Sequence, residues 1–263
     1  MKQVALVTGG SSGIGLQAAL ALQDAGFTVY ELSRKAAASS PIAHICGDVT
    51  EEASVKAAVQ KILDAEGHID VLVNNAGFGI SGAVEFTDLS SAQHQLDVNF
   101  FGMVRLCRAV LPAMRQAGHG RIINLSSVAA AIPIPFQTFY SASKAAINAY
   151  TMALANEVRP YGISVCAVMP GDIHTGFTVA REKAMAGDTE YGGRLSRSVE
   201  KMERDEAKGM DPAVIGRFIC HLAQKRSVKP LYAIRLDYKV FVLLSRLLPV
   251  RVLNWLIYQL YAK

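Results

Sequence analysis

The chain has 263 residues, of which 51% are hydrophobic and 19% charged, a composition that excludes intrinsic disorder. This length is sufficient for one α/β domain with a full hydrophobic core. The net charge of +5 could indicate a nucleic-acid partner, but the lysines and arginines are scattered and no nucleic-acid motif accompanies them. We therefore expect no nucleic-acid partner; an anionic cofactor or an acidic membrane surface explains the positive charge equally well.

The N-terminus runs directly into an apolar segment, Val4 to Val7, which leaves no room for a signal peptide. The four cysteines are widely separated and lie in apolar runs, so we expect buried thiols rather than disulfides or a metal site. They are Cys46, Cys107, Cys166 and Cys220. Both features predict a cytoplasmic protein.

A glycine-rich stretch, Thr8-Gly9-Gly10-Ser11-Ser12-Gly13-Ile14-Gly15, separates this first strand from a helical pattern that ends at Gly26. Gly9 and Gly10 can adopt positive φ without steric cost, and Gly15 allows the helix to pack closely on the strand. Gly13 lets a phosphate approach the backbone at the helix N-terminus, where anions are stabilised. Taken alone, the stretch could also be an ordinary turn.

Strand-like and helical segments then alternate along the chain. We expect strands over residues 28–32, 42–46, 71–74 and 121–125, a helix over 51–66 and a long helix over 89–118. This alternation predicts parallel strands joined by right-handed crossovers. The fold class is therefore α/β, with a Rossmann-like doubly wound parallel sheet, helices on both faces and a ligand at the carboxyl ends of the strands.

The end of the second strand indicates which dinucleotide is bound. An acidic residue there accepts a hydrogen bond from a ribose 2′-hydroxyl, whereas a cation accommodates a 2′-phosphate. The strand closes on Ser33-Arg34, which favours NADP(H), although Glu31 could be the acid and Arg34 only a solvated surface charge. Asp48, after the third strand, could contact the adenine or could cap the following helix.

Four polar positions later in the chain are candidates for chemistry. Asn99 lies in an apolar stretch and needs partners, which could be catalytic groups or simply a neighbouring backbone. Tyr140 and Lys144 are four residues apart in a helical pattern, so they share one face. A surface tyrosine on a lysine stem gives the same spacing, but the strand-end Ser127 thirteen residues earlier favours a site.

Taken in order, Thr-Gly-x-x-x-Gly-x-Gly, Asn-Asn-Ala-Gly, Ser and Tyr-x-x-x-Lys resemble the motifs of the short-chain dehydrogenase/reductase family. The resemblance runs from about Val4 to Phe177. The segments at 75–79, 127–129 and 175–177 are most similar to the branch with hydroxysteroid and retinol dehydrogenases. The resemblance implies a single domain over residues 1–263.

By this resemblance, Tyr140 is the catalytic acid/base, Lys144 is its partner, and Ser127 and Asn99 complete the catalytic set. The resemblance also implies that the Ile173 backbone and Thr175 hold the nicotinamide carboxamide. The implied cofactor-binding positions are Gly9, Ser11, Ser12, Gly13, Ile14, Gly15, Ser33, Arg34, Asp48, Val49, Asn75, Ala76, Gly77, Tyr140, Lys144, Pro170, Gly171, Ile173 and Thr175.

Carbonyl reduction needs a hydride donor, a proton donor and a group that polarises the carbonyl. We expect NADP(H) to supply the hydride, Tyr140 the proton and Ser127 a hydrogen bond to the substrate oxygen, with no metal. An ammonium ~4 Å from the phenol oxygen stabilises the ionised phenolate by about 4 kcal/mol at an effective dielectric of ~20. Lys144 would therefore lower the pKa of Tyr140 towards neutrality; it would also bind the ribose hydroxyls, while Asn99 would hold a proton-relaying water.

The expected activity is an NADP(H)-dependent oxidoreductase that interconverts a carbonyl and a secondary or primary alcohol on a small, largely apolar substrate. Epimerase or dehydratase chemistry could use the same site. A non-catalytic NADP(H)-binding regulator is a third alternative, although such a protein would usually have lost Ser127, Tyr140 or Lys144, which this chain keeps.

The departures from the family pattern lie late in the chain. Residues 178–209 are charged and without a clear period, and they stand where the family carries its substrate lid. A helix should begin at Asp211-Pro212-Ala213. Beyond it, many family members have a glycine-rich Val-Asp-Gly-Gly strand motif, which this chain replaces by Leu231 to Arg235.

Residues 237–263 are mostly apolar and form a predicted C-terminal helical extension. Arg246 and Arg251 lie in the middle of the segment, where inserting each into a bilayer would cost ~2.5 to 3.5 kcal/mol. Pro249 also interrupts the helix, so a membrane span is not favoured. We expect the apolar face to pack on its own domain or on a second subunit of a homo-oligomer, with peripheral membrane contact as a third option. The residues expected to be buried are Phe241, Leu244, Leu248, Leu253, Leu256 and Ile257.

Overall fold

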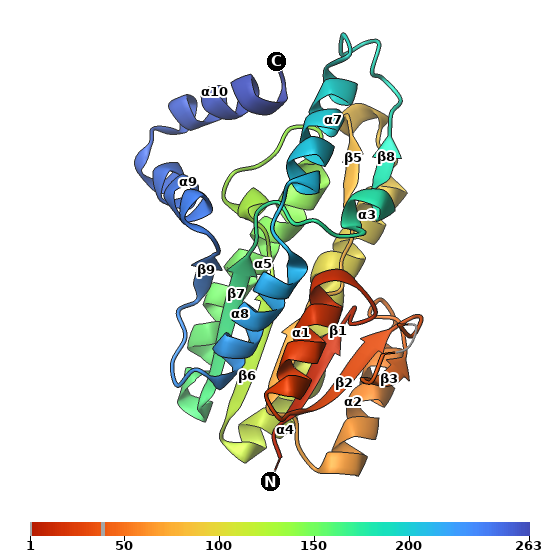
Figure 1. Ribbon diagram of the computed structural model, residues 1–263, viewed down its shortest axis with the longest axis vertical. Coiled ribbons are helices and arrows are strands. Elements are labelled where there is room, and N and C mark those ends of the chain that lie inside the picture. Colours follow the sequence, from red (N-terminus) through yellow and green to blue (C-terminus); the bar gives the residue numbers. More distant parts are fainter. Residues whose placement is uncertain (1, 38–39) are drawn as a thin grey trace.

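A parallel sheet lies at the centre of the computed structural model, which describes residues 2–37 and 40–263 (Figure 1). Within these residues its strand order is β3-β2-β1-β4-β6-β7-β9, and every neighbouring pair is parallel. The strands are β1 (Val4–Thr8), β2 (Thr28–Ser33), β3 (Ala43–Cys46), β4 (Val71–Asn74), β6 (Gly120–Leu125), β7 (Ile163–Met169) and β9 (Leu231–Ala233). The predicted doubly wound parallel sheet is confirmed, and its chain order reverses between β1 and β4, where such folds bind ligands.

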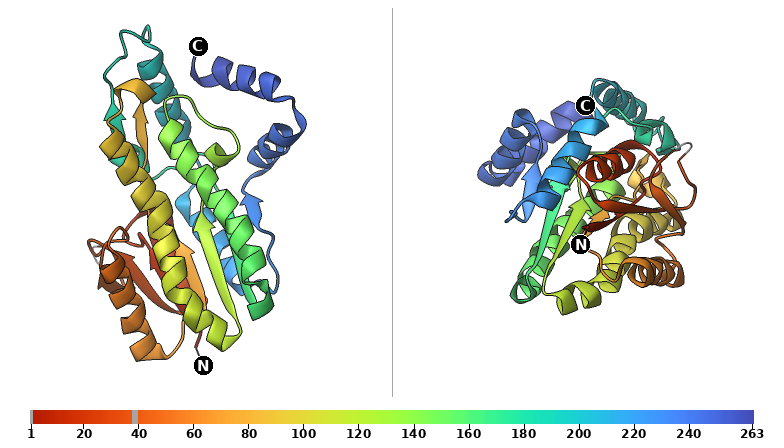
Figure 2. Two further views of the ribbon diagram at one scale, coloured as in Figure 1. Left: turned by 180° about the vertical axis from the view of Figure 1, so that it is seen from behind. Right: turned by 60° about the horizontal axis from the view of Figure 1, so that its bottom comes forward.

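Alternation along β1 divides the hydrophobic core into two layers. Val4 and Leu6 point into one layer, and Ala5 and Val7 into the other. Because helices cover both faces, the central strands β1 and β4 are buried along their whole length. The first layer is covered by α2 (Glu52–Glu66), α4 (Gly102–Ala117) and α5 (Thr138–Glu157), which the view from behind in Figure 2 shows; the second is covered by α1 (Gly13–Asp24) and α8 (Pro212–Gln224).

The helix expected over residues 89–118 is present, but it is not uniform. A π-helical turn, η2 (Asp97–Phe101), separates α3 (Leu89–Leu96) from α4. Such a turn inserts one extra residue into the helix and often occurs at functional sites. Here it contains Asn99, which a regular helical pattern could not have identified as a special position.

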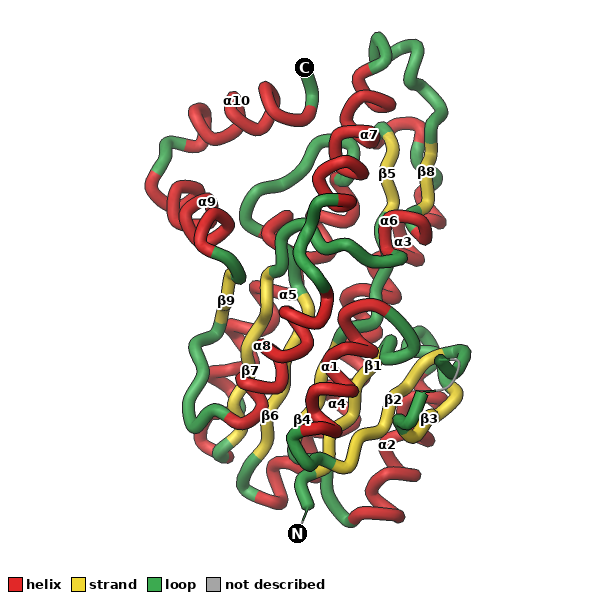
Figure 3. The backbone as a smooth tube through the Cα atoms, viewed as in Figure 1, coloured by secondary structure: helices red, strands yellow, loops and turns green. Residues whose placement is uncertain are grey.

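The segment after β7 forms a small subassembly that extends beyond the sheet (Figure 3). It contains α6 (Phe177–Ala180), β8 (Glu182–Ala184) and α7 (Arg194–Ala207). Strand β8 pairs in parallel with β5 (Ile80–Gly82), and α7 packs on Ala83 and Phe136. Short 3₁₀ turns lie at η1 (Val84–Phe86), η3 (Val128–Ala130) and η4 (Arg159–Tyr161).

The C-terminal part begins with α8, whose expected start at Asp211 is confirmed. The Asp211 carboxylate accepts a hydrogen bond from the Ala213 N–H at 2.8 Å. Strand β9 occupies the sheet edge beside β7 although the glycine-rich motif is missing. The predicted helical extension is present as α9 (Leu236–Leu247) and α10 (Val250–Tyr261), separated by Leu248 and Pro249.

The predicted burial of this extension against its own domain is wrong. Of the six residues named for it, only Ile257 is buried, at 5% exposure, while Phe241 remains 47% exposed. Figure 1 shows both helices extending away from the sheet beyond β9. Val242 and Ile257 are the residues of α9 and α10 that are buried. Within residues 2–37 and 40–263, no helix combines the length and the apolar character needed to cross a bilayer.

The cysteine prediction is right for three residues and wrong for one. Cys107, Cys166 and Cys220 are buried free thiols, whereas the free thiol of Cys46 is exposed. Cys46 ends β3, which is an edge strand with no further strand to cover it. An apolar run at a sheet edge therefore gives only partial burial.

The contact between α1 and α8 yields a stability prediction. A Cβ at Gly216 would lie 2.6 Å from the Gln17 backbone, whereas a Cβ at Gly176, with φ −63°, would meet no atom within 4 Å. Although alanine is the better helix former by ~1 kcal/mol, Gly216→Ala should destabilise the protein by about 1 to 3 kcal/mol because the helices must separate. The control Gly176→Ala should stay within about 0.5 kcal/mol. Thermal unfolding followed by circular dichroism measures both; an unchanged or higher Tm for Gly216→Ala would show that this contact is not tight.

Candidate active site

The glycine-rich turn after β1 has the close backbone approach expected of a phosphate-binding loop. Gly9 and Gly13 have φ of 63° and 53°, and a Cβ at Gly15 would lie 2.2 Å from the Gly9 carbonyl oxygen. Gly10 does not have a positive φ, so that expectation is wrong. Gly10 instead leaves room for Glu31, whose Cβ would be 2.6 Å from an added Cβ.

The surroundings of the turn fit a dinucleotide. Helix α1 begins at Gly13, so its N-terminal dipole favours an anion at the turn. A Cβ built on Gly13 would lie 3.7 Å from the Thr175 side chain, so Thr175 borders the turn next to Gly13. A side chain at Gly15 would break this cradle, and Ser11, Ser12 and Ile14 belong to the same turn.

The end of β4 is tied to the turn by an amide. The Asn75 side-chain amide donates to the carbonyl oxygens of Thr8 and Gly9 at 3.0 and 3.1 Å. The Thr8 hydroxyl oxygen accepts from the backbone N–H groups of Asn75 and Ala76 at 3.0 and 3.1 Å. Asn75 and Ala76 thus hold the ends of β1 and β4 together. These bonds give the Asn-Asn-Ala-Gly motif a structural role.

The end of β2 brings Glu31, Ser33 and Arg34 to the same edge. The Ser33 hydroxyl donates to the Glu31 carboxylate at 3.2 Å, so these two side chains share one face of the strand. Glu31 is 2% exposed and also contacts the His44 ring, whereas Arg34 is exposed to solvent. One oxygen of the acidic candidate, Oε1, is therefore engaged with protein partners, whereas Oε2 has none among the described residues. The Arg34 guanidinium is accessible.

Asp48 and Val49 mainly support the local structure. The Asp48 carboxylate accepts from the backbone N–H and the hydroxyl of Thr50 at 2.9 and 2.8 Å, as a residue that caps the turn before α2 would. Burial alone would raise the pKa of Asp48, but these bonds and the charge of Arg34 bring it below its usual value. Val49 is buried against Gly102, so any cofactor contact there would come from its backbone.

Ser127, Tyr140 and Lys144 come together where β6 ends and α5 begins. The Ser127 hydroxyl oxygen accepts from the Ala129 N–H at 3.1 Å, and Ser127 lies close enough to Tyr140 to oppose the rise of its pKa. The Lys144 ammonium lies 5.6 Å from the centre of the Tyr140 ring and donates to the Leu125 carbonyl at 2.8 Å. The structure thus places the three predicted catalytic side chains in one cluster.

The electrostatics of this cluster differ from the sequence-based expectation. Burial raises the pKa of Tyr140 to about 12, although the bond with Ser127 and the charge of Arg181 oppose the rise. Burial lowers the pKa of Lys144 to about 8. The expected fall of the Tyr140 pKa towards neutrality is therefore not found in the protein alone, because loss of hydration outweighs the neighbouring charges.

Asn99 is buried beside this cluster. Its carbonyl oxygen accepts from the Phe78 N–H at 2.9 Å, and its amide donates to the Phe78 carbonyl at 3.0 Å and to the Ser143 hydroxyl at 3.1 Å. A Cβ on Gly77 would lie 3.0 Å from the Asn99 oxygen and 3.7 Å from the Lys144 nitrogen. Asn99 thus bonds to a neighbouring backbone, as one alternative held, and also lies close to Lys144.

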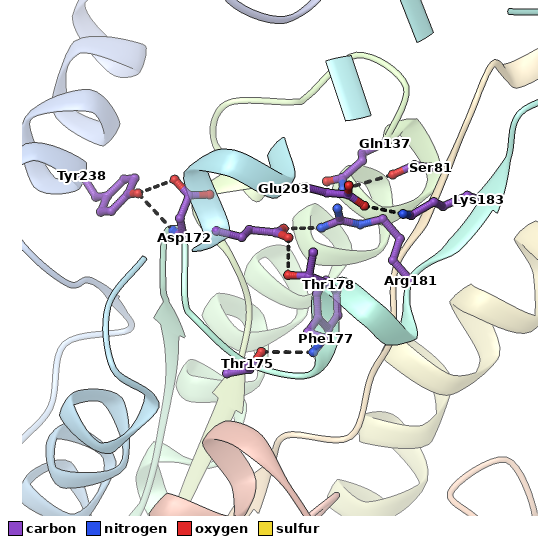
Figure 4. Close-up of polar contacts among 11 residues, drawn as sticks. Ser81, Gln137, Asp172, Thr175, Phe177, Thr178, Arg181, Lys183, Glu203 and Tyr238 are labelled. Atoms are coloured by element: carbon purple, nitrogen blue, oxygen red, sulfur yellow. Dashed lines mark hydrogen bonds and ion pairs between the residues drawn. The ribbon is translucent and has the colours of Figure 1, made fainter. Parts of the chain in front are cut away.

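The segment 170–175 lies over the turn and is fixed from two sides. The Pro170 carbonyl accepts from the Val128 N–H at 3.0 Å, next to Ser127. A Cβ on Gly171 would overlap the Tyr238 ring at 2.0 Å, and the Tyr238 hydroxyl donates to the Asp172 carboxylate at 2.6 Å and accepts from its N–H at 3.0 Å (Figure 4). The C-terminal extension therefore holds the segment that contains Ile173 and Thr175.

Sequence reasoning missed a polar cluster above Tyr140. Arg181 is fully enclosed and forms an ion pair with Glu206, which also accepts from the Thr178 hydroxyl at 2.5 Å. The Phe177 ring lies between them and the site, 5.7 Å from the Tyr140 ring and 5.7 Å from the Arg181 guanidinium (Figure 4). Nothing in the aperiodic sequence of this region signals that an arginine there is buried.

Comparisons with known proteins agree with this geometry. A family model described as short chain dehydrogenase matches residues 3–186. A 3-ketodihydrosphingosine reductase from Bacteroides thetaiotaomicron is 43% identical over 228 residues, covering 86% of this chain and 85% of that protein. A short-chain dehydrogenase structure from Streptomyces avermitilis has a TM-score of 0.83 and 31% identity, covering 98% of this chain and 96% of its own. The structure of ElxO with NADP bound has a TM-score of 0.76 and 26% identity, and the match covers 91% of this chain and 100% of that chain.

The burial of Lys144 yields a pH-dependent prediction. Its pKa is about 8 in the folded state against an ordinary value of 10.5, so the unfolded chain binds more protons between these values and stability rises with pH there. Below pH 8 the buried charge costs about 3 kcal/mol, part of which the bond to Leu125 offsets. Lys144→Met should therefore be more stable than the unmutated protein at pH 7, with an advantage that shrinks towards pH 10. Urea unfolding at both pH values measures the difference. A variant that is less stable than the unmutated protein at pH 7 would show that burial does not lower the pKa of Lys144 in this way.

Proposed function

The chain belongs to the short-chain dehydrogenase/reductase family, and from that premise we propose that it is an NADP(H)-dependent oxidoreductase that interconverts a carbonyl and an alcohol on a largely apolar substrate. Family membership makes it an oxidoreductase that acts with a nicotinamide cofactor. The observation that carries the finer proposal is the cluster of Ser127, Tyr140 and Lys144 beside the glycine turn.

The cofactor would be held by the turn from Gly9 to Gly15, by the β4 end at residues 75–77 and by the segment 170–175. When bound, it supplies the hydride for carbonyl reduction. Lys144 would bind its ribose hydroxyls, because the ammonium is fixed by Leu125 and lies next to Gly77 and Tyr140. The close packing around Gly9 and Gly15 supports this placement.

Tyr140 would act as the proton donor. Because burial raises its pKa to about 12, the hydroxyl keeps its proton at neutral pH and donates it readily to a strongly basic alkoxide oxygen. Ser127, which lies beside Tyr140, would hydrogen-bond the same substrate oxygen and orient it. This electrostatic arrangement keeps the proton available for transfer to a reduced carbonyl oxygen. Lys144 has a pKa of about 8, close enough to neutrality for it to hold or release a proton beside Tyr140.

Asn99 would contribute by position. Its amide holds the Phe78 backbone and the Ser143 hydroxyl near Lys144, and from there it would fix a proton-relaying water. Together with Ser127 and Tyr140 it completes the proposed catalytic set. The presence of all these groups in one cluster favours an enzyme over a non-catalytic regulator.

The substrate would lie against apolar walls on the side of Tyr140 away from the sheet. The Phe177 ring lies next to Tyr140, and we propose residues 178–209 as the lid within a single domain over residues 1–263. The lid helix α7 packs on Phe136 and Ala83, which supports an apolar chamber. The name of the Bacteroides relative makes 3-ketodihydrosphingosine, a ketone with a long alkyl chain, the first substrate to test.

We also propose that the protein works in the cytoplasm as a homo-oligomer. The free thiols of its four cysteines support a reducing compartment. Phe101 and Met152 expose 48% and 43% of their surface on η2 and α5, which supports an interface on that side. Peripheral membrane contact would involve a different part of the surface, the C-terminal extension.

Tyr140→Phe removes the transferable proton and leaves the rest of the proposed nucleotide site unchanged. We expect kcat for NADPH-dependent ketone reduction to fall by 10² to 10⁴ while NADPH affinity stays within about twofold. Steady-state assays with 3-ketodihydrosphingosine and a panel of simpler ketones measure kcat, and fluorescence titration measures NADPH binding. Retention of more than about a tenth of kcat would exclude Tyr140 as the general acid.

Arg34 should determine the choice of nucleotide. A charge-assisted bond to the 2′-phosphate is worth about 1.5 to 3 kcal/mol, so Arg34→Ala should lower kcat/KM for NADPH by one to two decades and leave kcat/KM for NADH nearly unchanged. Arg159→Ala, which removes an exposed arginine on η4, is the matched control. Equal kcat/KM for NADPH and NADH in the unmutated enzyme would instead favour Glu31 as a ribose ligand.

A further inference from the structure

The C-terminal extension exposes an apolar surface that is too large for an ordinary soluble face. Leu243, Leu247 and Val250 expose 55%, 70% and 79% of their surface, and Val252, Trp255 and Leu260 expose 43%, 57% and 53%. These residues lie on α9 and α10 and at the junction between them. Soluble monomers rarely expose contiguous apolar patches of this kind unless the patch is an interaction site.

Beyond Asp237, whose carboxylate pairs with Arg235, the charges of the same segment are all of one sign. From Tyr238 to Lys263 the chain carries Lys239, Arg246, Arg251 and Lys263 and no aspartate or glutamate. The exposed apolar side chains are therefore accompanied only by cations, which complement an anionic surface. Two copies of the extension packed face to face would bring eight cations together without a counter-charge from either segment, so a second copy fits less well.

The extension is fixed at both ends and protrudes in the middle. At its start, Tyr238 is hydrogen-bonded to Asp172. At its end, Ala262 is buried in a cluster with Leu195 and Val199 of the lid helix α7. Figures 1 and 3 show α9 and α10 as an arm that leaves the sheet at β9 and returns towards α7. The protruding part is thus joined to both segments that surround the candidate site.

The lengths of the helices determine how a bilayer could receive this arm. Helices α9 and α10 have 12 residues each, or about 18 Å at 1.5 Å per residue, against ~30 Å of hydrocarbon. They are too short to span, but amphipathic helices with cationic and aromatic side chains lie in the headgroup region. Trp255 and Tyr258 are side chains of the type that gathers at this depth.

We infer that α9 and α10 form a docking surface for an anionic lipid bilayer, with the stretch from Leu243 to Trp255 buried among the headgroups. Docking holds the lid and the segment 170–175 next to the bilayer. On the proposed function, this position lets an apolar ketone pass from the lipid phase to Tyr140. The membrane contact itself does not depend on that activity.

Vesicle binding by the full chain tests the inference. The probes are vesicles of phosphatidylcholine with phosphatidylglycerol, and vesicles of phosphatidylcholine alone. We expect co-sedimentation with the anionic vesicles, weakened by high salt, together with a blue shift in the emission of Trp255, the one tryptophan of the sequence. Arg246→Gln with Arg251→Gln should weaken binding about 25-fold, from about fivefold for each charge.

A matched pair of apolar variants separates docking from general hydrophobicity. Leu247→Asp with Val250→Asp should reduce anionic vesicle binding more than tenfold, whereas Leu89→Asp, at an equally exposed leucine of α3, should leave it unchanged. Reduction of a water-soluble ketone should be the same in all these variants, and reduction of a vesicle-borne ketone should fall only in the docking variants. If vesicles bind but no ketone is reduced, docking stands and the proposed function fails.

Two results would overturn the inference. One is the absence of binding to anionic vesicles by the unmutated protein. The other is an oligomer in sedimentation velocity that Leu247→Asp with Val250→Asp dissociates, because the surface would then be covered by a second copy of this chain.

Discussion

The close contact between Gly15 and Gly9 is the constraint on which the site depends. It brings the N-terminus of α1 against the end of β1, and the Asn75 amide joins the end of β4 to the same two carbonyl groups. Because the chain order reverses between these two strands, their ends separate the helices of the two faces and leave a place for a ligand. The catalytic cluster at the end of β6 lies at the next strand along the same edge.

Desolvation sets the chemistry at that edge. The same burial that raises the pKa of Tyr140 lowers that of Lys144, so the pair is held as a neutral acid beside a cation that is easily neutralised. This arrangement costs stability, as active sites often do, and the apolar layers on both sides of the sheet offset the cost. On the proposed function, Tyr140 would therefore hold its proton before any substrate enters.

The fold and most of the site could be predicted because their signals are local. Apolar runs and glycine turns placed the strands, and a four-residue spacing placed Tyr140 beside Lys144. The π-turn at Asn99 and the Arg181–Glu206 pair depend on contacts that have no periodic pattern. The extension shows a different limit: helical spacing identified an apolar face but could not tell whether protein, lipid or nothing covers it.

The central claim is that this site transfers a hydride from a nicotinamide cofactor to a ketone carbon. Its most direct test uses NADPH with deuterium in place of both hydrogens at nicotinamide C4, a ketone that the enzyme accepts, and mass spectrometry of the product alcohol. The account predicts one deuterium on the carbinol carbon for each NADPH oxidised. NADPH oxidation without deuterium in the product, or product formed without NADPH oxidation, would contradict it.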